Sequence, residues 1–265
     1  MSRPEPLRRR SERRVAAGRP ILLAATVFIA VAAIAVGVWR EAANPRFNVQ
    51  IAGVTGLEHT SASDVVAAAN LVDGQNVWLI DRQAVAERIQ ALPWVDRATL
   101  HVRWPNRLTI SVSERRPAAL VALGAVGGVA PQATPEAGFA EIDETGRVLV
   151  TGVGERPADL PLLIVVPPPV QVKPAMQLDR PDIAAALDAY HRLSALGLHV
   201  SEVALAPSTG MSATADRNLR VLFGEDEDLA KKAELFQAIV AKISTPSRVA
   251  YVDVRSVRAP TVLYR

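Results

Sequence analysis

The chain contains no cysteine, and only 5% of its 265 residues are aromatic. The missing thiols exclude a disulfide framework and every metal site that needs a thiolate ligand. No two of the four histidines stand at the spacing of a metal-binding pair; they are His59, His101, His191 and His199. Each is interpreted as a surface or half-buried side chain, and the sequence predicts neither a metal site nor a cofactor.

Catalytic motifs are missing as well. The chain has no S-x-x-K, G-x-S-x-G or H-E-x-x-H motif and no phosphate-binding loop. Residues 152–154 read Gly-Val-Gly, but neither a third glycine nor the start of a helix follows, so they do not form a dinucleotide-binding fingerprint. The acidic run at 225–228 fits a cation site or, as we prefer, favourable charge at a helix N-terminus. The sequence therefore predicts that the protein is not an enzyme.

Charge is absent from one long apolar segment, residues 21–39. At about 1.5 Å per residue, a helix of this length crosses a hydrocarbon core of about 30 Å. A buried core helix would keep a polar side, which this segment lacks. A cleaved signal peptide has an apolar core of roughly 7–15 residues before a small-residue cleavage site, whereas this segment is longer and ends in Gly-Val-Trp-Arg. We therefore predict an uncleaved transmembrane helix.

Basic charge is concentrated in the tail before this helix. Seven arginines and two glutamates give residues 1–20 a net charge of +5, so the rest of the chain carries −2 of the total of +3. Basic flanks stay on the cytoplasmic side of a membrane, which predicts a cytoplasmic N-terminus and an extracytoplasmic location for residues 41–265. The part of the chain beyond the tail has no excess of basic over acidic residues, so it gives no indication of nucleic-acid binding. Binding of nucleic acid or anionic lipid by the tail is a minor alternative.

Residues 47–117 predict a small module with the order β-α-α-β-β. Asp81 is a candidate helix N-cap, Pro93 ends the same helix, and Pro105-Asn106 forms a hairpin turn. Apolar periodicity places the five elements, in chain order, at 47–56, 61–71, 81–92, 95–103 and 107–113. Three strands covered by two helices bury one face of a sheet, so the module can fold on its own.

Four short motifs stand out in this module: Leu92-Pro93-Trp94-Val95, Trp104-Pro105-Asn106, Leu108-Thr109-Ile110 and Glu114-Arg115-Arg116-Pro117. In this order they resemble the POTRA domain of the bacterial division proteins FtsQ and DivIB, where the same string directly follows one membrane span. The resemblance implies a POTRA domain at 47–117 and a role in cell division. Trp94 and Trp104 are either exposed recognition aromatics or, as we prefer, part of the packing.

Residues 118–265 predict a second domain. A low-complexity stretch at 124–138 precedes a hairpin at 139–150 and an extended segment at 160–163. The later elements are helices at 181–196 and 227–243 and strands at 200–206, 219–223, 249–255 and 261–264. This order, with Ile142-Asp143-x-x-Gly146 and a Tyr-Val-Asp-Val-Arg string at 251–255, resembles the β-rich second domain of FtsQ/DivIB. The expected fold class is α+β: one N-terminal transmembrane helix at 21–39, a POTRA domain, and a mixed α/β domain with a largely antiparallel sheet.

The last predicted strand, 261–264, is expected to lie at an open edge of its sheet, because the chain stops at Arg265. An edge strand offers unpaired N–H and C=O groups to a partner strand. A strand inside the sheet fits the residues equally well. The resemblance favours the edge, because in FtsQ-like proteins the C-terminal end of the β domain receives the single-span protein FtsB (DivIC), which comes with FtsL. The contact residues implied by position are Arg255, Ser256, Val257, Arg258, Thr261, Val262, Leu263 and Tyr264.

The resemblance implies a non-catalytic scaffold that spans the inner membrane once and is concentrated at the division septum. It would bind FtsB/DivIC-like and FtsL-like partners outside the cytoplasm and help to control septal wall synthesis. A POTRA-containing component of protein export is the alternative function. Such proteins carry a membrane barrel, whose regular strands of about ten residues are not found here. An anchored wall hydrolase is a third class, and the missing motifs argue against it.

Overall fold

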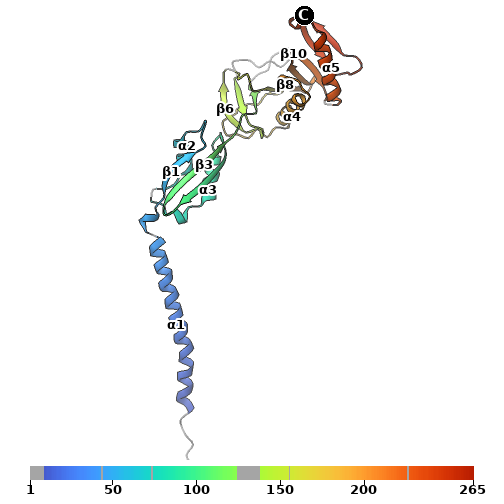
Figure 1. The fold of residues 1–265 in the computed structure, drawn as a ribbon. Coiled ribbons are helices and arrows are strands. Elements are labelled where there is room, and N and C mark those ends of the chain that lie inside the picture. Colours follow the sequence, from blue (N-terminus) through green and yellow to red (C-terminus); the bar gives the residue numbers. More distant parts are fainter. Residues whose placement is uncertain (1–8, 43, 73, 124–137, 155, 226) are drawn as a thin grey trace, which may run out of the picture.

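The computed structural model describes residues 9–42, 44–72, 74–123, 138–154, 156–225 and 227–265. It consists of a long helix, a three-stranded sheet with its helices, and a nine-stranded sheet with its helices. These parts follow one another along an extended molecule, and the C-terminus lies at the end furthest from the first helix (Figure 1). The fold is therefore of the α+β class that the sequence predicts.

The first helix, α1 (Arg9–Ala42), contains the apolar segment. Its stretch Leu23–Glu41 is long and apolar enough to cross a membrane, and none of it is buried inside the protein. Large apolar side chains along this stretch, from Leu23 to Trp39, are exposed. Such exposure is unfavourable in water and favourable in lipid. The stretch is therefore a candidate membrane span.

The smaller sheet has the predicted order of elements. Its strands lie in the order β1-β3-β2, with β1 parallel to β3 and β2 antiparallel to it. The elements are β1 (Gln50–Thr55), α2 (Ala62–Ala69), α3 (Arg82–Gln90), β2 (Val95–Arg103) and β3 (Arg107–Glu114). The two helices close the core over one face of the sheet through Val65, Val85 and Ile89, which pack with Leu108 and Ile110.

Local chemistry explains where these elements begin and end. The Asp81 carboxylate accepts hydrogen bonds from the backbone N–H groups of Gln83 and Ala84, which confirms it as the N-cap of α3. The first strand begins three residues later than predicted, because a 3₁₀ turn, Pro45–Phe47, comes before it. Trp104 is exposed, so the preference for packing was wrong for this residue. The apolar alternation of β2 runs one step beyond the strand and into the turn.

The larger sheet has the strand order β12-β11-β10-β9-β8-β7-β4-β5-β6. Five of its eight strand pairs are antiparallel, as the sequence predicts. Its elements are β4 (Ala119–Ala122), β5 (Phe139–Ile142), β6 (Val148–Val153), β7 (Leu162–Val165), α4 (Pro181–Ala195), β8 (Val200–Ala206), β9 (Gly210–Ala215), β10 (Leu219–Gly224), α5 (Leu229–Lys242), β11 (Val249–Asp253) and β12 (Thr261–Tyr264).

The main core of this part lies between the sheet and the helices α4 and α5. Phe236 of α5 meets Phe223 of β10 edge to face, with ring centroids 6.5 Å apart. Strand β9 was missed by the sequence reading, because it consists mostly of small residues that are buried on both faces and do not alternate. The low-complexity stretch predicted at 124–138 lies, except for its last residue, outside the described residues.

Candidate functional site

The last strand, β12, occupies one edge of the nine-stranded sheet. It pairs antiparallel with β11, and among the described residues no strand pairs with its other side. Directly after β12, the backbone N–H of Arg265 donates to the carbonyl of Arg248 over 2.7 Å. The register along the strand pair is Val249↔Tyr264, Tyr251↔Leu263, Val252↔Val262 and Asp253↔Thr261.

The backbone groups of β12 alternate between the two sides of the strand. Because the N–H of Arg265 faces β11, the alternation turns the N–H groups of Val262 and Tyr264 to the unpaired side. Leu263 and Tyr264 are 49% and 62% exposed, whereas Val262 packs against the main core. Judged by the residues that the structure describes, the edge therefore offers backbone groups without a partner strand beside exposed apolar side chains, which is the surface that strand addition requires.

The turn before β12 carries the other residues that were predicted for this site. Arg255 is held by the Asp253 carboxylate: its Nε lies 3.0 Å from each oxygen and its Nη2 lies 2.7 Å from Oδ2. These hydrogen bonds lower the pKa of Asp253 and raise that of Arg255. The next three residues, 256–258, are exposed. The structure thus brings all eight predicted contact residues together in one hairpin.

A buried lysine supports the strands behind this edge. Lys232 of α5 is buried, and its Nζ donates to the carbonyls of Phe223 (2.9 Å) and Glu225 (2.7 Å). These two carbonyls flank Gly224, where β10 ends, and a Cβ at Gly224 would lie 3.0 Å from the Cγ of Arg255. A lysine in an amphipathic helix ordinarily reads as a surface residue, so the periodicity of the sequence does not reveal this role.

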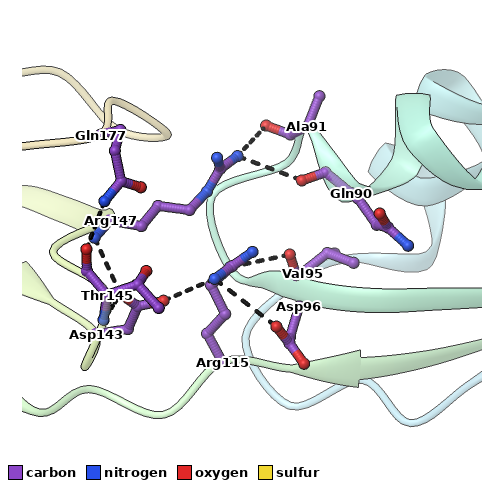
Figure 2. A network of polar contacts seen from close by, with 9 residues as sticks. All are labelled: Gln90, Ala91, Val95, Asp96, Arg115, Asp143, Thr145, Arg147 and Gln177. Carbon is purple, nitrogen blue, oxygen red and sulfur yellow. Dashed lines mark hydrogen bonds and ion pairs between the residues drawn. The ribbon is translucent and has the colours of Figure 1, made fainter. Parts of the chain in front are cut away.

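A polar network joins the two sheets (Figure 2). Arg115, directly after β3, donates from Nη1 to the Asp143 carboxylate over 2.7 Å and from Nε to the carbonyl of Val95 over 3.1 Å. In the opposite direction, Arg147 donates from Nη2 to the carbonyls of Ala91 (3.0 Å) and Gln90 (3.3 Å), where α3 ends. Each domain therefore holds the other through one arginine, and we call these contacts the interdomain joint.

Asp143 is the centre of the interdomain joint. Its Oδ1 accepts hydrogen bonds from the Thr145 backbone N–H and hydroxyl and from the Arg147 backbone N–H, at 2.7 to 2.9 Å. Burial alone would raise the pKa of Asp143, but the hydrogen bonds from Thr145, Arg115 and Arg147 outweigh it and lower the pKa. The carboxylate therefore stays ionised between two arginines. Arg115 and Asp143 each lie in one of the sequence motifs given above, but neither motif indicates that the two side chains meet.

Three of the histidines each lie beside one carboxylate. The pairs are His59 with Glu114 (3.1 Å), His191 with Glu144 (3.0 Å) and His199 with Asp216 (3.1 Å). Within the part of the chain that the structure describes, no group of three or more histidine, aspartate or glutamate side chains gathers as metal ligands.

Glu114 is held in its ionised form by the backbone around it. Burial would raise the pKa of Glu114, but hydrogen bonds from the backbone of Thr60 and His59 lower this pKa to about 2.

A candidate membrane span, a β-α-α-β-β module and a larger mixed sheet with an open edge define a membrane-anchored, two-domain POTRA protein. Residues 47–115 match the family model "POTRA domain, FtsQ-type", and residues 133–255 match "Cell division protein FtsQ/DivIB, C-terminal". Together the two models match more than two-thirds of the chain. The chain belongs to the FtsQ/DivIB family of cell division proteins.

Similar curated proteins carry the same family name. Cell division protein FtsQ of Chloroflexus aurantiacus is 28% identical over 221 residues, which cover 83% of this chain and 75% of the relative. Its counterpart in Chloroflexus aggregans is 29% identical over 211 residues, or 79% and 71% of the two chains. The protein of that name in Streptomyces griseus is 26% identical over 215 residues, or 81% and 96%. These likenesses favour a role in division over one in protein export.

Proposed function

We propose that this protein is a non-catalytic scaffold of the division machinery. Its N-terminus is cytoplasmic, its two folded domains are extracytoplasmic, and it is concentrated at the septum. It binds FtsB/DivIC-like and FtsL-like single-span partners outside the membrane and thereby helps to control septal wall synthesis. Family membership and the candidate membrane span support this proposal.

One observation carries the binding mode: within the described part of the chain, no strand pairs with the outer side of β12. A partner strand laid along it would satisfy the outward N–H groups of Val262 and Tyr264 and cover the exposed side chain of Leu263. The exposed turn at 255–258 would then meet the residues that flank the partner's strand. Backbone pairing supplies the affinity in this mode, and side chains along the strand supply the selectivity.

Membrane anchoring strengthens such contacts. Partners that are anchored in the same bilayer meet at a high effective concentration, so a short strand pairing with modest intrinsic affinity is sufficient. Because the C-terminal edge lies at the end of the molecule furthest from α1 (Figure 1), the partner must reach it with an extended extracytoplasmic segment.

Replacing Val262 with proline tests this mode of binding. Proline removes the outward N–H but no hydrogen bond to β11, and an edge strand tolerates it, so the domain should stay folded. We expect co-purification of an FtsB/DivIC-like partner with the membrane-reconstituted protein to be lost. The control Val262→Thr keeps both the N–H and the side-chain shape and should retain the partner. A folded Val262→Pro protein that still captures the partner would refute strand addition.

A further inference from the structure

The small domain has one end that faces the first helix. Its helix α2 begins near Glu114, at the far end of β3, and runs back toward this end. The turn between β2 and β3 lies at the same end, because the N–H of Gln50, at the start of β1, donates to the carbonyl of Asn106 over 2.8 Å. Figure 1 shows α1 leading directly into this end of the domain.

Exposed apolar side chains gather at this end. Five large apolar side chains are exposed in the described part of residues 47–117. Four of them lie at this end, in the connection between α2 and α3 and in the turn between β2 and β3. We call these four the apolar tip; they are Val72, Trp78, Leu79 and Trp104. Trp78 and Trp104 are 59% and 57% exposed, which is unusual for side chains of this size. A concentrated apolar surface of this kind indicates a binding surface.

The tryptophans of the apolar tip are held in place by their neighbours. The rings of Trp78 and Trp104 lie 4.3 Å apart between centroids, and Phe47 meets Trp78 edge to face at 6.1 Å. The Asn76 side chain accepts a hydrogen bond from the Trp78 backbone N–H over 2.9 Å and fixes its loop. The exposed aromatic faces are therefore a built feature of the domain and not the ends of loose loops.

The apolar tip is continuous with the candidate membrane span. Gly37, Val38 and Glu41 of α1 line one hollow together with Phe47 and Trp78. Arg46 forms an ion pair with Glu41 at 2.6 Å, close to the end of α1, so the connector is short and held back against the helix. A domain attached in this way has its near end at the membrane surface.

The chemistry of the apolar tip fits the lipid–water interface. Tryptophan is enriched at this depth, because its ring is apolar and its N–H remains hydrated. The hairpin turn also places the exposed Arg103 and Arg107 on either side of Trp104, and cations there attract anionic headgroups. We propose that the apolar tip inserts into the headgroup region of the outer leaflet. The POTRA domain then rests on the bilayer, and this contact sets the direction in which the distal sheet is presented.

The chain provides its own depth reporters, because it has four tryptophans. Trp39 lies on the candidate span, Trp78 and Trp104 lie in the apolar tip, and Trp94 stacks on His59 (4.0 Å) at the far end of the POTRA domain. The full-length protein is reconstituted in vesicles of phosphatidylcholine and phosphatidylglycerol with and without bromine on the acyl chains. Three Trp→Phe combinations leave Trp39 alone, the tip pair alone, or Trp94 alone.

We expect bromine to quench the emission of Trp39 and of the tip pair and to leave that of Trp94 unchanged. The tip pair should also emit at shorter wavelength in vesicles without bromine than Trp78 and Trp104 do in detergent-free buffer after proteolytic release from α1. Quenching of Trp39 without quenching of the tip pair would overturn the proposal and mark the tip as a surface for protein. If Trp39 itself escapes quenching, α1 is not in the bilayer and the proposal falls with it.

Discussion

Replacing Asp143 with alanine is expected to lower the free energy of unfolding by about 3–5 kcal/mol, the range for breaking one partner of a buried ion pair. Asp143 and Arg115 expose only 7% and 15% of their side chains. The substitution removes the close carboxylate partner of Arg115 and leaves the exposed Asp96, at 3.7 Å, as the carboxylate beside this cation. It also removes the acceptor of the Thr145 and Arg147 backbone N–H groups. Uncompensated buried charge, not the loss of an attraction alone, makes the effect large.

The effect of Asp143→Ala is measured by urea unfolding of the detergent-solubilised protein, followed by circular dichroism. Asp96→Ala is the matched control, because Asp96 faces the same guanidinium at 3.7 Å but is 51% exposed. Exposed ion pairs contribute about 0–1 kcal/mol, so this variant should differ little from the parent protein. Equal effects of the two substitutions would show that the interdomain joint does not depend on the buried pair.

Lys232→Met is expected to lower the free energy of unfolding by about 3 kcal/mol, because two hydrogen bonds from a charged donor, each contributing roughly 1.5–3 kcal/mol, are lost. Methionine keeps the apolar stem of the side chain, so the change isolates the ammonium group. Without it, the buried carbonyl of Phe223 loses this donor, and the end of β10 is held less firmly. Since β10 pairs with β11, the loosening reaches the strand that supports β12.

Lys231→Met provides the comparison for Lys232, one position away on the same helix. Lys231 is exposed and pairs with Asp228 at 2.8 Å, so its replacement should leave the unfolding midpoint nearly unchanged. Amide hydrogen exchange should show faster exchange along β10 and β11 in the Lys232 variant and not in the Lys231 variant. A Lys232→Met protein as stable as its parent would mean that water replaces the ammonium group at these carbonyls.

Periodicity and turn residues predicted the POTRA domain well, because its information is local. Asp81, Pro93 and the turn at 105–106 each act within a few residues of their position in the chain. Local pattern also explains the wrong prediction for Trp104. The apolar alternation of β2 continues past the end of the strand, so it predicted packing for a side chain that is exposed. Strand β9 was not predicted, because its buried small residues show neither the helical nor the strand periodicity of apolar side chains.

The candidate site depended on information that no local pattern contains. The string Thr-Val-Leu-Tyr at 261–264 fits an edge strand and an inner strand equally well, and only the strand order of the whole sheet separates the two. The interdomain joint pairs Arg115 with Asp143, residues that belong to different domains. A lysine in an amphipathic helix is typical of the protein surface, yet Lys232 is buried. In each case the partner is set by the tertiary fold and not by neighbouring residues.

Residue-resolved amide hydrogen exchange, with and without a saturating FtsB/DivIC-like partner, tests strand addition at β12 most directly. The N–H of Arg265 already donates a hydrogen bond to the carbonyl of Arg248 in the free protein, so its exchange serves as the internal reference for a protected amide. We expect the outward amides of Val262 and Tyr264 to exchange quickly in the free protein and to become strongly protected in the complex. Unchanged exchange at these two amides, with new protection elsewhere, would contradict strand addition at β12.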